Sequence, residues 1–379
     1  METAILTGGV DAIDAIAEEW EALCEEGCNE PFLRPEWFRA FVKNFGLDIE
    51  LFTVRREGNL RAILPIAVIS GTFHGIPVRK LSAAYNLNTP RFDLIHGADP
   101  GERAATISCL WNVIRSRGGW NLLEFRLVKA DSWLSDLIEL SETEKHYTGV
   151  WKMDSAPFIS LPCDDHIEKF EQRYYKTPAR KHLGSELNRR FKRLKELGEI
   201  EVKVTNTFSP EMMKMYFELE RKGWKGRGGT DAAKDPRVAQ LHNDFSAAVA
   251  QKGALVAFEL KLDGRTIAMF FTLRYGARSM YWKTSYDEEF RRYSPGNILF
   301  REYLRDCIRE GITEVDMLSP STGNKRVWAT GEREHVAFYV FRPGIVGTLL
   351  WTWKFGVIAR LRELTNKTPE TYVPAEAQG

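Results

Sequence analysis

The clearest alternation of apolar and polar positions lies between Arg278 and Lys325, where the pattern predicts a strand, a loop, a helix and a second strand. The first strand is indicated by bulky side chains at every second position, namely Met280, Trp282 and Thr284. The helix is indicated by apolar residues at helical spacing, which are Ile298, Leu299, Leu304 and Ile308. A glycine at position 311 favours a helix end, and residues 315–317 then predict the second strand.

The start of this helix has the features of an anion-binding site. Ser294, Pro295 and Gly296 open the helix. A helix start has free N–H groups and a partial positive charge, so it suits a phosphate or pyrophosphate. Arg291 and Arg292 come just before it, and guanidinium groups pair readily with phosphate oxygens.

The first part of the chain mixes helical and strand patterns. Apolar residues at helical spacing predict helices over residues 10–26, 35–45, 102–116 and 133–140. A turn at Glu57-Gly58-Asn59 between two apolar runs predicts a hairpin over residues 49–68, and residues 122–127 have the pattern of a strand. This half is therefore predicted to be mixed α and β, with antiparallel pieces.

The second part begins near residue 150, where an extended segment leads into a helical block. Its predicted helices cover residues 164–197, with a break at Thr177-Pro178, and residues 209–222, 238–250 and 346–364. A three-stranded antiparallel meander is predicted from residue 255 onward, and a last strand over residues 336–341. Because a chain of 379 residues is long for one domain, we predict two domains, at 1–150 and 151–379.

Composition narrows the classes of function. The net charge is +1, so overall charge gives no argument for nucleic-acid binding. The five cysteines are scattered and the seven histidines have no ligand spacing, so we expect reduced thiols and no metal. The N-terminus lacks the basic region of a secretory signal, and the apolar stretch 345–361 is interrupted by Lys354 and Arg360. We therefore expect a cytoplasmic protein without a membrane span.

Two basic segments are candidates for contact with a substrate. Between residues 173 and 195 the chain carries many cations, namely Arg173, Lys176, Arg180, Lys181, Arg189, Arg190, Lys192, Arg193 and Lys195. They form either a solvated helix face or a surface that meets an anionic substrate. The glycine-rich loop 223–230 carries Trp224, Lys225 and Arg227. It is either an ordinary surface loop or one that covers a substrate.

Several short motifs resemble the GNAT acyltransferase superfamily. They are the segments 264–268, 294–299, 314–317 and 325–328. More narrowly, the chain resembles the bacterial CelD-like proteins, a branch named for cellulose biosynthesis and related to the FemAB-like double-GNAT fold. The segments 31–37 and 64–66 also resemble that branch, so the resemblance covers most of the chain.

The resemblance implies an α+β fold of two GNAT-like domains, each a mixed, mostly antiparallel sheet flanked by helices. In this family acyl-CoA enters a gap between the fourth and fifth strands. The resemblance places acyl-CoA on residues of the fourth strand and of the helix start, namely Trp282, Thr284, Arg291, Arg292, Ser294, Gly296 and Asn297. The family's loop has a basic residue and two glycines, whereas only Gly296 is present here, after a proline without an N–H. FemAB-like relatives that take their acyl group from aminoacyl-tRNA share this departure.

Acyl transfer from a thioester to an amine needs a base, donors for the oxyanion and a proton for the departing thiolate. Asp316 lies beside the implied gap and is the first candidate for a base or amine ligand. Lys325 matches the lysine that follows this strand in the FemAB-like pattern, and Tyr281 could protonate the thiolate. Trp328 is expected to form a wall of the substrate site, together with Trp224, Lys225 and Arg227 of the glycine-rich loop. For each of these residues an ordinary packing or surface role is the alternative.

We therefore predict an N-acyltransferase that moves an acyl group, which we expect to be acetyl, from acyl-CoA to an amine by direct attack. The acceptor would be a sugar nucleotide, an amino acid or a polysaccharide precursor. One alternative is an aminoacyl-tRNA-dependent peptide ligase, which would bind tRNA through the basic segment 173–195. Another is an inactive accessory protein of exopolysaccharide synthesis. Its helix 349–361 would dock on a partner or a membrane surface, or simply pack on the sheet.

Overall fold

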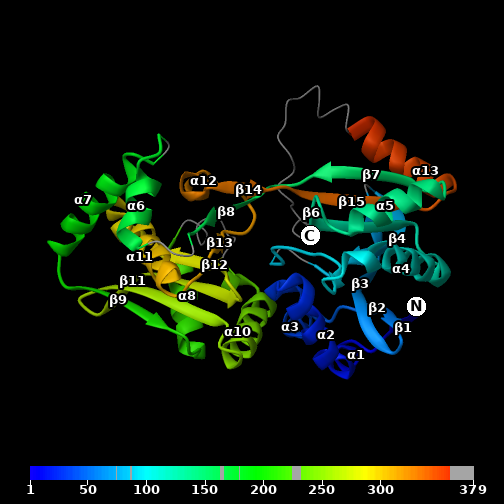
Figure 1. The fold of residues 1–379 in the computed structure, drawn as a ribbon, viewed down its shortest axis with the longest axis horizontal. Helices are drawn as coiled ribbons and strands as arrows, with labels where there is room; N and C mark the ends of the chain where they lie inside the picture. Colours follow the sequence, from blue (N-terminus) through cyan, green and yellow to red (C-terminus); the bar gives the residue numbers. More distant parts are fainter. Residues whose placement is uncertain (74, 86–87, 163–165, 179, 224–231, 359–379) are drawn as a thin grey trace. The chain divides into compact units, whose positions relative to one another are not determined.

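The computed structural model describes residues 1–379 except 74, 86–87, 163–165, 179, 224–231 and 359–379. The chain forms two compact units (Figure 1). Met1–Ser155 and the chain from Arg333 onward make the first unit, and Ala156–Glu332 make the second. Both units are α+β, with a mixed, mostly antiparallel sheet flanked by helices, which confirms the predicted fold class.

The first unit is built on a sheet whose strands follow the order β1-β2-β3-β4-β6-β15-β7, with β5 paired to β3. Neighbouring strands are antiparallel except β4 and β6, which are parallel. The strands are β1 (Glu2–Leu6), β2 (Ile49–Arg56), β3 (Asn59–Phe73), β4 (Ile76–Ala83), β5 (Ile95–His96), β6 (Leu122–Lys129), β7 (Tyr147–Lys152) and β15 (His335–Phe341). The hairpin predicted over residues 49–68 is β2 and β3.

Helices cover this sheet. They are α1 (Val10–Ala15), α2 (Ala17–Leu23), α3 (Pro35–Phe45), α4 (Arg103–Arg117), α5 (Leu134–Thr143) and α13 (Ile345–Trp351), with the π-helices η1 (Cys24–Cys28) and η6 (Thr352–Ile358) and the 3-10 helices η2 (Pro31–Leu33) and η3 (Pro100–Glu102). The predicted helix over residues 10–26 is two helices, because the backbone at Ile16 leaves the helical region with φ −126°. Pro35 begins α3 and the left-handed Gly46 ends it, as predicted.

The second unit has the strand order β14-β8-β13-β12-β11-β10-β9. Strands β9 to β12 are antiparallel neighbours, β12 and β13 are parallel, and β13 and β8 are antiparallel. The strands are β8 (Ala156–Ser160), β9 (Ile200–Thr205), β10 (Leu255–Leu262), β11 (Arg265–Tyr275), β12 (Arg278–Tyr286), β13 (Glu314–Asp316) and β14 (Gly331–Arg333). The predicted meander is β10, β11 and β12.

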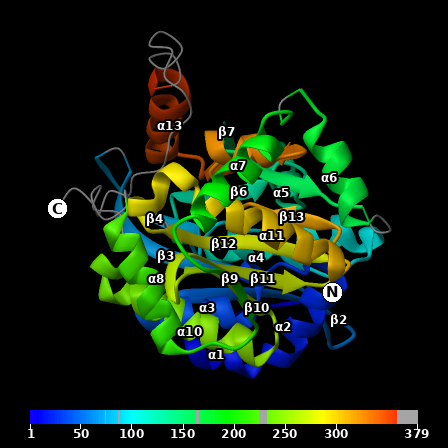
Figure 2. The ribbon, with the colours of Figure 1, turned by 90° about the vertical axis from the view of Figure 1, so that its left-hand side faces the viewer.

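Helices lie on both faces of the second sheet (Figure 2). They are α6 (Ile167–Tyr175), α7 (Leu183–Lys195), α8 (Pro210–Lys222), α10 (Pro236–Gln251), α11 (Pro295–Arg309) and α12 (Gly323–Trp328), with the short turns η4 (Ala232–Lys234) and η5 (Glu288–Tyr293). Tyr303 of α11 packs on Phe258 with a centroid distance of 5.2 Å. Phe245 of α10 packs on Trp282 at 5.3 Å, so the two helices anchor to the sheet through aromatic contacts.

The end of the chain differs from the predicted division into 1–150 and 151–379. The strand predicted over residues 336–341 exists as β15, but it pairs with β6 and β7 of the first sheet. The second unit is therefore an insertion, Ala156–Glu332, between two parts of the first. Strand partners are chosen by contacts that are distant in sequence, and a local pattern carries no information about them. No helix of the described residues is long and apolar enough to cross a membrane.

Candidate active site

Strands β12 and β13 separate soon after they meet. Their parallel ladder covers only three residue pairs, namely Arg278–Glu314, Ser279–Val315 and Met280–Asp316. On its other side β12 stays paired with β11 as far as Tyr286. The edge of β12 that faces β13 is therefore unpaired by that strand from residue 281 onward, because β13 ends at Asp316. We call this point the divergence of β12 and β13.

The divergence begins at a left-handed residue, Leu318, whose φ is 58°. Two of the predicted site residues hold its backbone. The Leu318 N–H donates to Oδ1 of Asp316 at 2.9 Å, and Nζ of Lys325 donates to the Leu318 carbonyl at 3.0 Å. The structure thus brings Asp316 and Lys325 together, with the turn that opens the sheet between them.

The carboxylate of Asp316 is enclosed as well as bonded. Its residue is 0% exposed, and its Oδ2 lies 3.3 Å from the guanidinium of Arg278. Arg278 also contacts Glu314 at 2.9 Å. A buried carboxylate engaged by a guanidinium and a backbone N–H fits the positioning of a turn better than proton removal from a substrate. Arg278 is a residue of this site that the sequence did not single out.

A β-bulge re-aims the side chains of β12 beside the divergence. Its register with β11 shifts so that Tyr281 and Lys283 pair with consecutive residues and Trp282 is left over. Tyr281 packs on Phe300 of α11 at 4.8 Å. Trp282 packs on the opposite side, against Phe245 and His242 of α10. Trp282 is thus part of the α10 packing surface, while Tyr281 lies on the α11 side.

Tyr281 has the protonation state that a proton donor needs. Burial raises the pKa of Tyr281 to about 12, and its hydroxyl donates to Oγ1 of Thr284 at 2.7 Å. The carbonyl of Thr284 in turn accepts from Tyr216 of α8 at 3.5 Å. Two predicted residues, Tyr281 and Thr284, are therefore joined on one strand, and the phenol stays protonated at neutral pH.

The predicted anion-binding loop lies at the end of β12. Arg291 and Arg292 are exposed in η5, and α11 begins at Pro295 after Ser294 in the left-handed region (φ 52°). Gly296 lies against the ring of Tyr286, where an added Cβ would be 3.7 Å away. The free edge of β12 thus leads directly to the start of α11.

A side chain from α7 reaches this helix start. The guanidinium of Arg190 donates to Oγ of Ser294 and pairs with Glu186. A second bond links α7 to α11, from Arg301 to Oδ1 of Asn188 at 2.7 Å. Arg190 was predicted only as one cation of the basic segment 173–195, because its partner lies about a hundred positions away in the chain.

Trp328 closes the other side of the α11 start. Its indole N–H contacts Oδ1 of Asn297 at 3.4 Å, and its ring packs on Phe300 at 4.8 Å. The side chain is 2% exposed and packs in the hydrophobic core of this unit, and its role as a wall of the substrate site stays a prediction. The remaining predicted substrate residues, Trp224, Lys225 and Arg227, lie outside the described residues.

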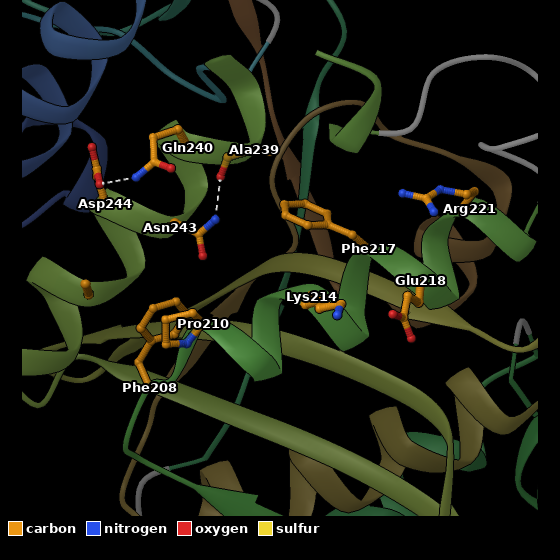
Figure 3. A pocket seen from close by; sticks show the side chains of 11 residues that line it. Phe208, Pro210, Lys214, Phe217, Glu218, Arg221, Ala239, Gln240, Asn243 and Asp244 are labelled. Carbon is orange, nitrogen blue, oxygen red and sulfur yellow. Dashed lines mark hydrogen bonds between the residues drawn. The ribbon is translucent and has the colours of Figure 1, made fainter. Parts of the chain in front are cut away.

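A hollow of about 600 Å³ lies elsewhere on this unit, between α8 and α10 (Figure 3). Phe208 and Phe217 give it apolar walls, and Lys214, Arg221 and Asp244 bring charge to its rim. None of the predicted site residues in the described part of the chain lines it. Among the described residues no group of three or more His, Cys, Asp or Glu side chains is placed to hold a metal ion.

Residues 181–326 match the family model described as "Acetyltransferase (GNAT) domain". The match includes β12, β13 and the start of α11 but fewer than half of the residues of the chain. No curated protein matches the sequence.

Solved structures resemble nearly the whole chain. FemX superimposes with a TM-score of 0.58 and 13% identity, over 90% of this chain and 98% of that chain. A tandem GNAT protein from the clavulanic acid biosynthesis pathway superimposes with a TM-score of 0.50 and 12% identity, over 91% of this chain and 100% of that chain. At such identities the likeness shows the fold, which is that of two GNAT-like units. Together with the domain match over residues 181–326, it supports an acyltransferase.

Proposed function

We propose that this acyltransferase is an N-acyltransferase that takes its acyl group from acyl-CoA at the divergence of β12 and β13. The proposal rests on one observation: β12 loses β13 as a neighbour after Met280 and yet continues to Tyr286, next to the start of α11. An unpaired strand edge can form main-chain hydrogen bonds with an extended ligand. The pantetheine arm of CoA, which contains two amides, is such a ligand.

The start of α11 would receive the pyrophosphate. Pro295 has no N–H, and in the described part of the chain no carbonyl accepts from the Gly296 N–H. Arg190, Arg291 and Arg292 supply cations beside this helix start. The positive end of the helix and these guanidinium groups favour a diphosphate at the same place.

The chemistry would be direct attack of an amine on the thioester carbonyl. A bond forms between the amine nitrogen and the acyl carbon, and the bond from that carbon to sulfur breaks. Tyr281, whose phenol is protonated at neutral pH, would give its proton to the departing thiolate, and the proton that the attacking nitrogen loses would pass to the phenolate, directly or through water. Asp316 and Lys325 would hold the Leu318 turn that keeps the strands apart. We assign no general base, since the carboxylate of Asp316 is engaged.

We propose that the acceptor is an amine of a small molecule or of a glycan precursor. Trp328 would line its site, and the loop with Trp224, Lys225 and Arg227 would cover it. This part of the proposal rests on the family resemblance and on the buried position of Trp328 beside Asn297.

Calorimetry with acetyl-CoA tests the proposed donor. We expect one site per chain, and we expect Arg190→Gln to weaken binding by roughly tenfold, the scale of one lost charge-assisted bond. Arg309→Gln at the far end of α11 is the matched control and should bind like the wild type, since that side chain is exposed and pairs with Asp306. If the wild type does not bind acetyl-CoA, or Arg309→Gln weakens binding as much as Arg190→Gln, the assigned donor site is wrong.

The exposed side of α7 favours a second candidate, transfer from aminoacyl-tRNA. Four cations lie on that side of the helix, namely Arg189, Lys192, Arg193 and Lys195. Binding to the phosphate backbone of tRNA would fall steeply with salt, because cations are released from the nucleic acid. Binding of acetyl-CoA that changes little with salt, together with no retention of tRNA at low salt, would exclude this candidate.

A further inference from the structure

The C-terminal helical segment of the first unit carries a line of exposed apolar side chains. α13 and η6 run without a break from Ile345 to Ile358. Ile345, Leu349, Trp353 and Val357 follow one another at intervals of four, and they are 82%, 56%, 45% and 38% exposed. The second half is a π-helix, which winds more residues into each turn and keeps these positions on one side. We call these four residues the apolar stripe.

The opposite side of the same segment is firmly packed on the sheet. Phe355 lies over Gly149 of β7, where a Cβ would be 2.1 Å from the ring. The ammonium group of Lys354 lies 4.4 Å from the ring centroid of Tyr339 in β15, and the indole N–H of Trp351 donates to Thr148 at 2.7 Å. Figure 1 shows α13 beside β7 and β15. The stripe is therefore exposed on an anchored helix, and the sheet cannot cover it without losing these contacts.

The charged residues within this stretch of the sequence have one sign. From residue 342 to residue 362 the sequence has four cations, Arg342, Lys354, Arg360 and Arg362, and no Asp or Glu. At the start of the segment a second exposed arginine, Arg79, joins Arg342. Both are tied to Asn121, which donates to the Arg79 carbonyl at 2.8 Å and accepts from the Arg342 N–H at 3.0 Å. Two exposed arginines whose backbones are joined through Asn121 thus stand at the base of the apolar stripe.

We infer that this segment binds the surface of an anionic lipid membrane. An apolar stripe with a tryptophan, next to cations and without acidic residues, matches a helix that lies in the interface between water and lipid. The stripe would enter the acyl region, while Arg79 and Arg342 would contact lipid phosphates. The segment would lie on the membrane and not cross it, because the described helices are too short to span one. This inference does not depend on the acyl donor.

Vesicle flotation of the full chain tests the inference. Wild-type protein should float with phosphatidylcholine vesicles that contain phosphatidylglycerol and stay below with phosphatidylcholine alone. The double variant Leu349→Glu and Trp353→Glu should bind the anionic vesicles at least about tenfold more weakly, because two apolar contacts become charged. Arg79→Gln with Arg342→Gln should weaken binding and reduce its dependence on salt.

The matched control places the same change on another exposed apolar pair. Val202 and Val204 of β9 are 36% and 46% exposed, so Val202→Glu with Val204→Glu should float like the wild type. Thermal unfolding of all variants checks that the fold is kept. The inference is overturned if the wild type does not float, if it floats equally with neutral vesicles, or if the stripe variant floats like the control. If the wild type does not float but sediments as a dimer, and only the stripe variant is a monomer, the apolar stripe binds a second copy of the chain and the inference is overturned.

Discussion

At the scale of single residues, the divergence of β12 and β13 depends on Leu318. A left-handed backbone at a side chain of this size costs about 1–3 kcal/mol and persists only where its surroundings hold it. Asp316 and Lys325 do so by accepting from its N–H and donating to its carbonyl. Asp316 and Lys325, which the sequence proposed for chemistry, thus stabilise the Leu318 turn beside the site.

Substitution of Asp316 separates this positioning role from that of a base. Asp316→Ala leaves the Leu318 N–H and part of the Arg278 charge without their acceptor. We expect it to lower the free energy of unfolding by about 3 kcal/mol, as for a broken buried pair. Asp316→Asn keeps one carbonyl oxygen and should lose less stability, with kcat of the folded protein within about tenfold of the wild type. Urea titration and steady-state kinetics measure both. If kcat falls by a hundredfold or more in a stable Asp316→Asn variant, Asp316 acts as a general base and the positioning role alone is wrong.

Tyr281→Phe tests the proton donor. The change removes one hydroxyl, which donates to Oγ1 of Thr284, so stability should fall by only about 1 kcal/mol. Transfer should slow by about a hundredfold, the lower end for a lost general acid. Thr284→Val is the control, because it removes the partner and keeps the phenol, and it should slow transfer far less. Rates can be compared for a thioester with a good leaving group and for one with a poor leaving group. If Tyr281→Phe is as fast as the wild type with both, Tyr281 does not act as the proton donor.

The sequence could nominate Asp316, Lys325 and Tyr281, but it could not say what they touch. Asp316 is bound to Arg278, which lies 38 positions earlier in the chain. That contact exists only because β12 and β13 are parallel neighbours, and a parallel pair always joins segments that are distant in sequence. Residue type therefore indicated which reactions a side chain could support. The hydrogen-bond partners, which only the fold shows, determine which of these roles each residue can have.

At the scale of elements, the start of α11 carries the proposed diphosphate site. Gly296→Ala there should leave the fold intact, since the added Cβ meets only the Tyr286 ring at 3.7 Å and alanine favours a helix by about 1 kcal/mol over glycine. The same Cβ would stand beside the free N–H group, so we expect KM for acetyl-CoA to rise by roughly tenfold with kcat unchanged.

A second helix start provides the control for this change. Gly323 begins α12, and a Cβ added there would meet nothing within 4 Å. Gly323→Ala should therefore keep both KM and stability. If KM stays the same for Gly296→Ala, or rises equally for both variants, the diphosphate does not lie on the start of α11.

Elements with strong local signals were predicted well. Strand β12, helix α11 and strand β13 follow from period-two alternation, a proline at the helix start and a glycine at its end, all of which act within a few residues. The break of the first helix at Ile16 and strand β4 (Ile76–Ala83) were missed. Neither residue type nor spacing indicates the break at Ile16. Strand β4 forms through its pairing with β3 and β6, which a local pattern does not show.

At the scale of the whole molecule, the chain leaves the first unit after Ser155 and returns at Arg333. Strand β15 lies between β6 and β7 of the first sheet and follows the second unit in the chain. The first sheet is therefore complete only after the second unit has been synthesised. The two units therefore have separate cores but a shared order of assembly. Such a chain can unfold in two steps, one for each unit, and pH should separate them.

Alkaline pH should destabilise the second unit first. Burial raises the pKa of the Cys307 thiol from 9.0 and of the Tyr281 phenol from 10.0, both to about 12. A group whose pKa is raised on folding gives stability that is complete below its unfolded pKa and lost as the pH rises through its folded pKa. For these groups the loss falls between pH 9 and pH 12, at about 1.4 kcal/mol per pH unit and group.

The first unit contains a buried carboxyl group, that of Asp93, which titrates in a lower pH range. Burial raises the pKa of Asp93 from 3.8 to about 6, so its effect on stability is already complete at neutral pH. Urea titrations at pH 8 and near pH 11 should then show one transition moving to lower urea and one staying nearly in place. Cys307→Ser removes one titrating group from the second unit and should reduce the shift of the moving transition. Equal shifts of both transitions, or the same shift in Cys307→Ser, would show that these buried groups do not control the pH response.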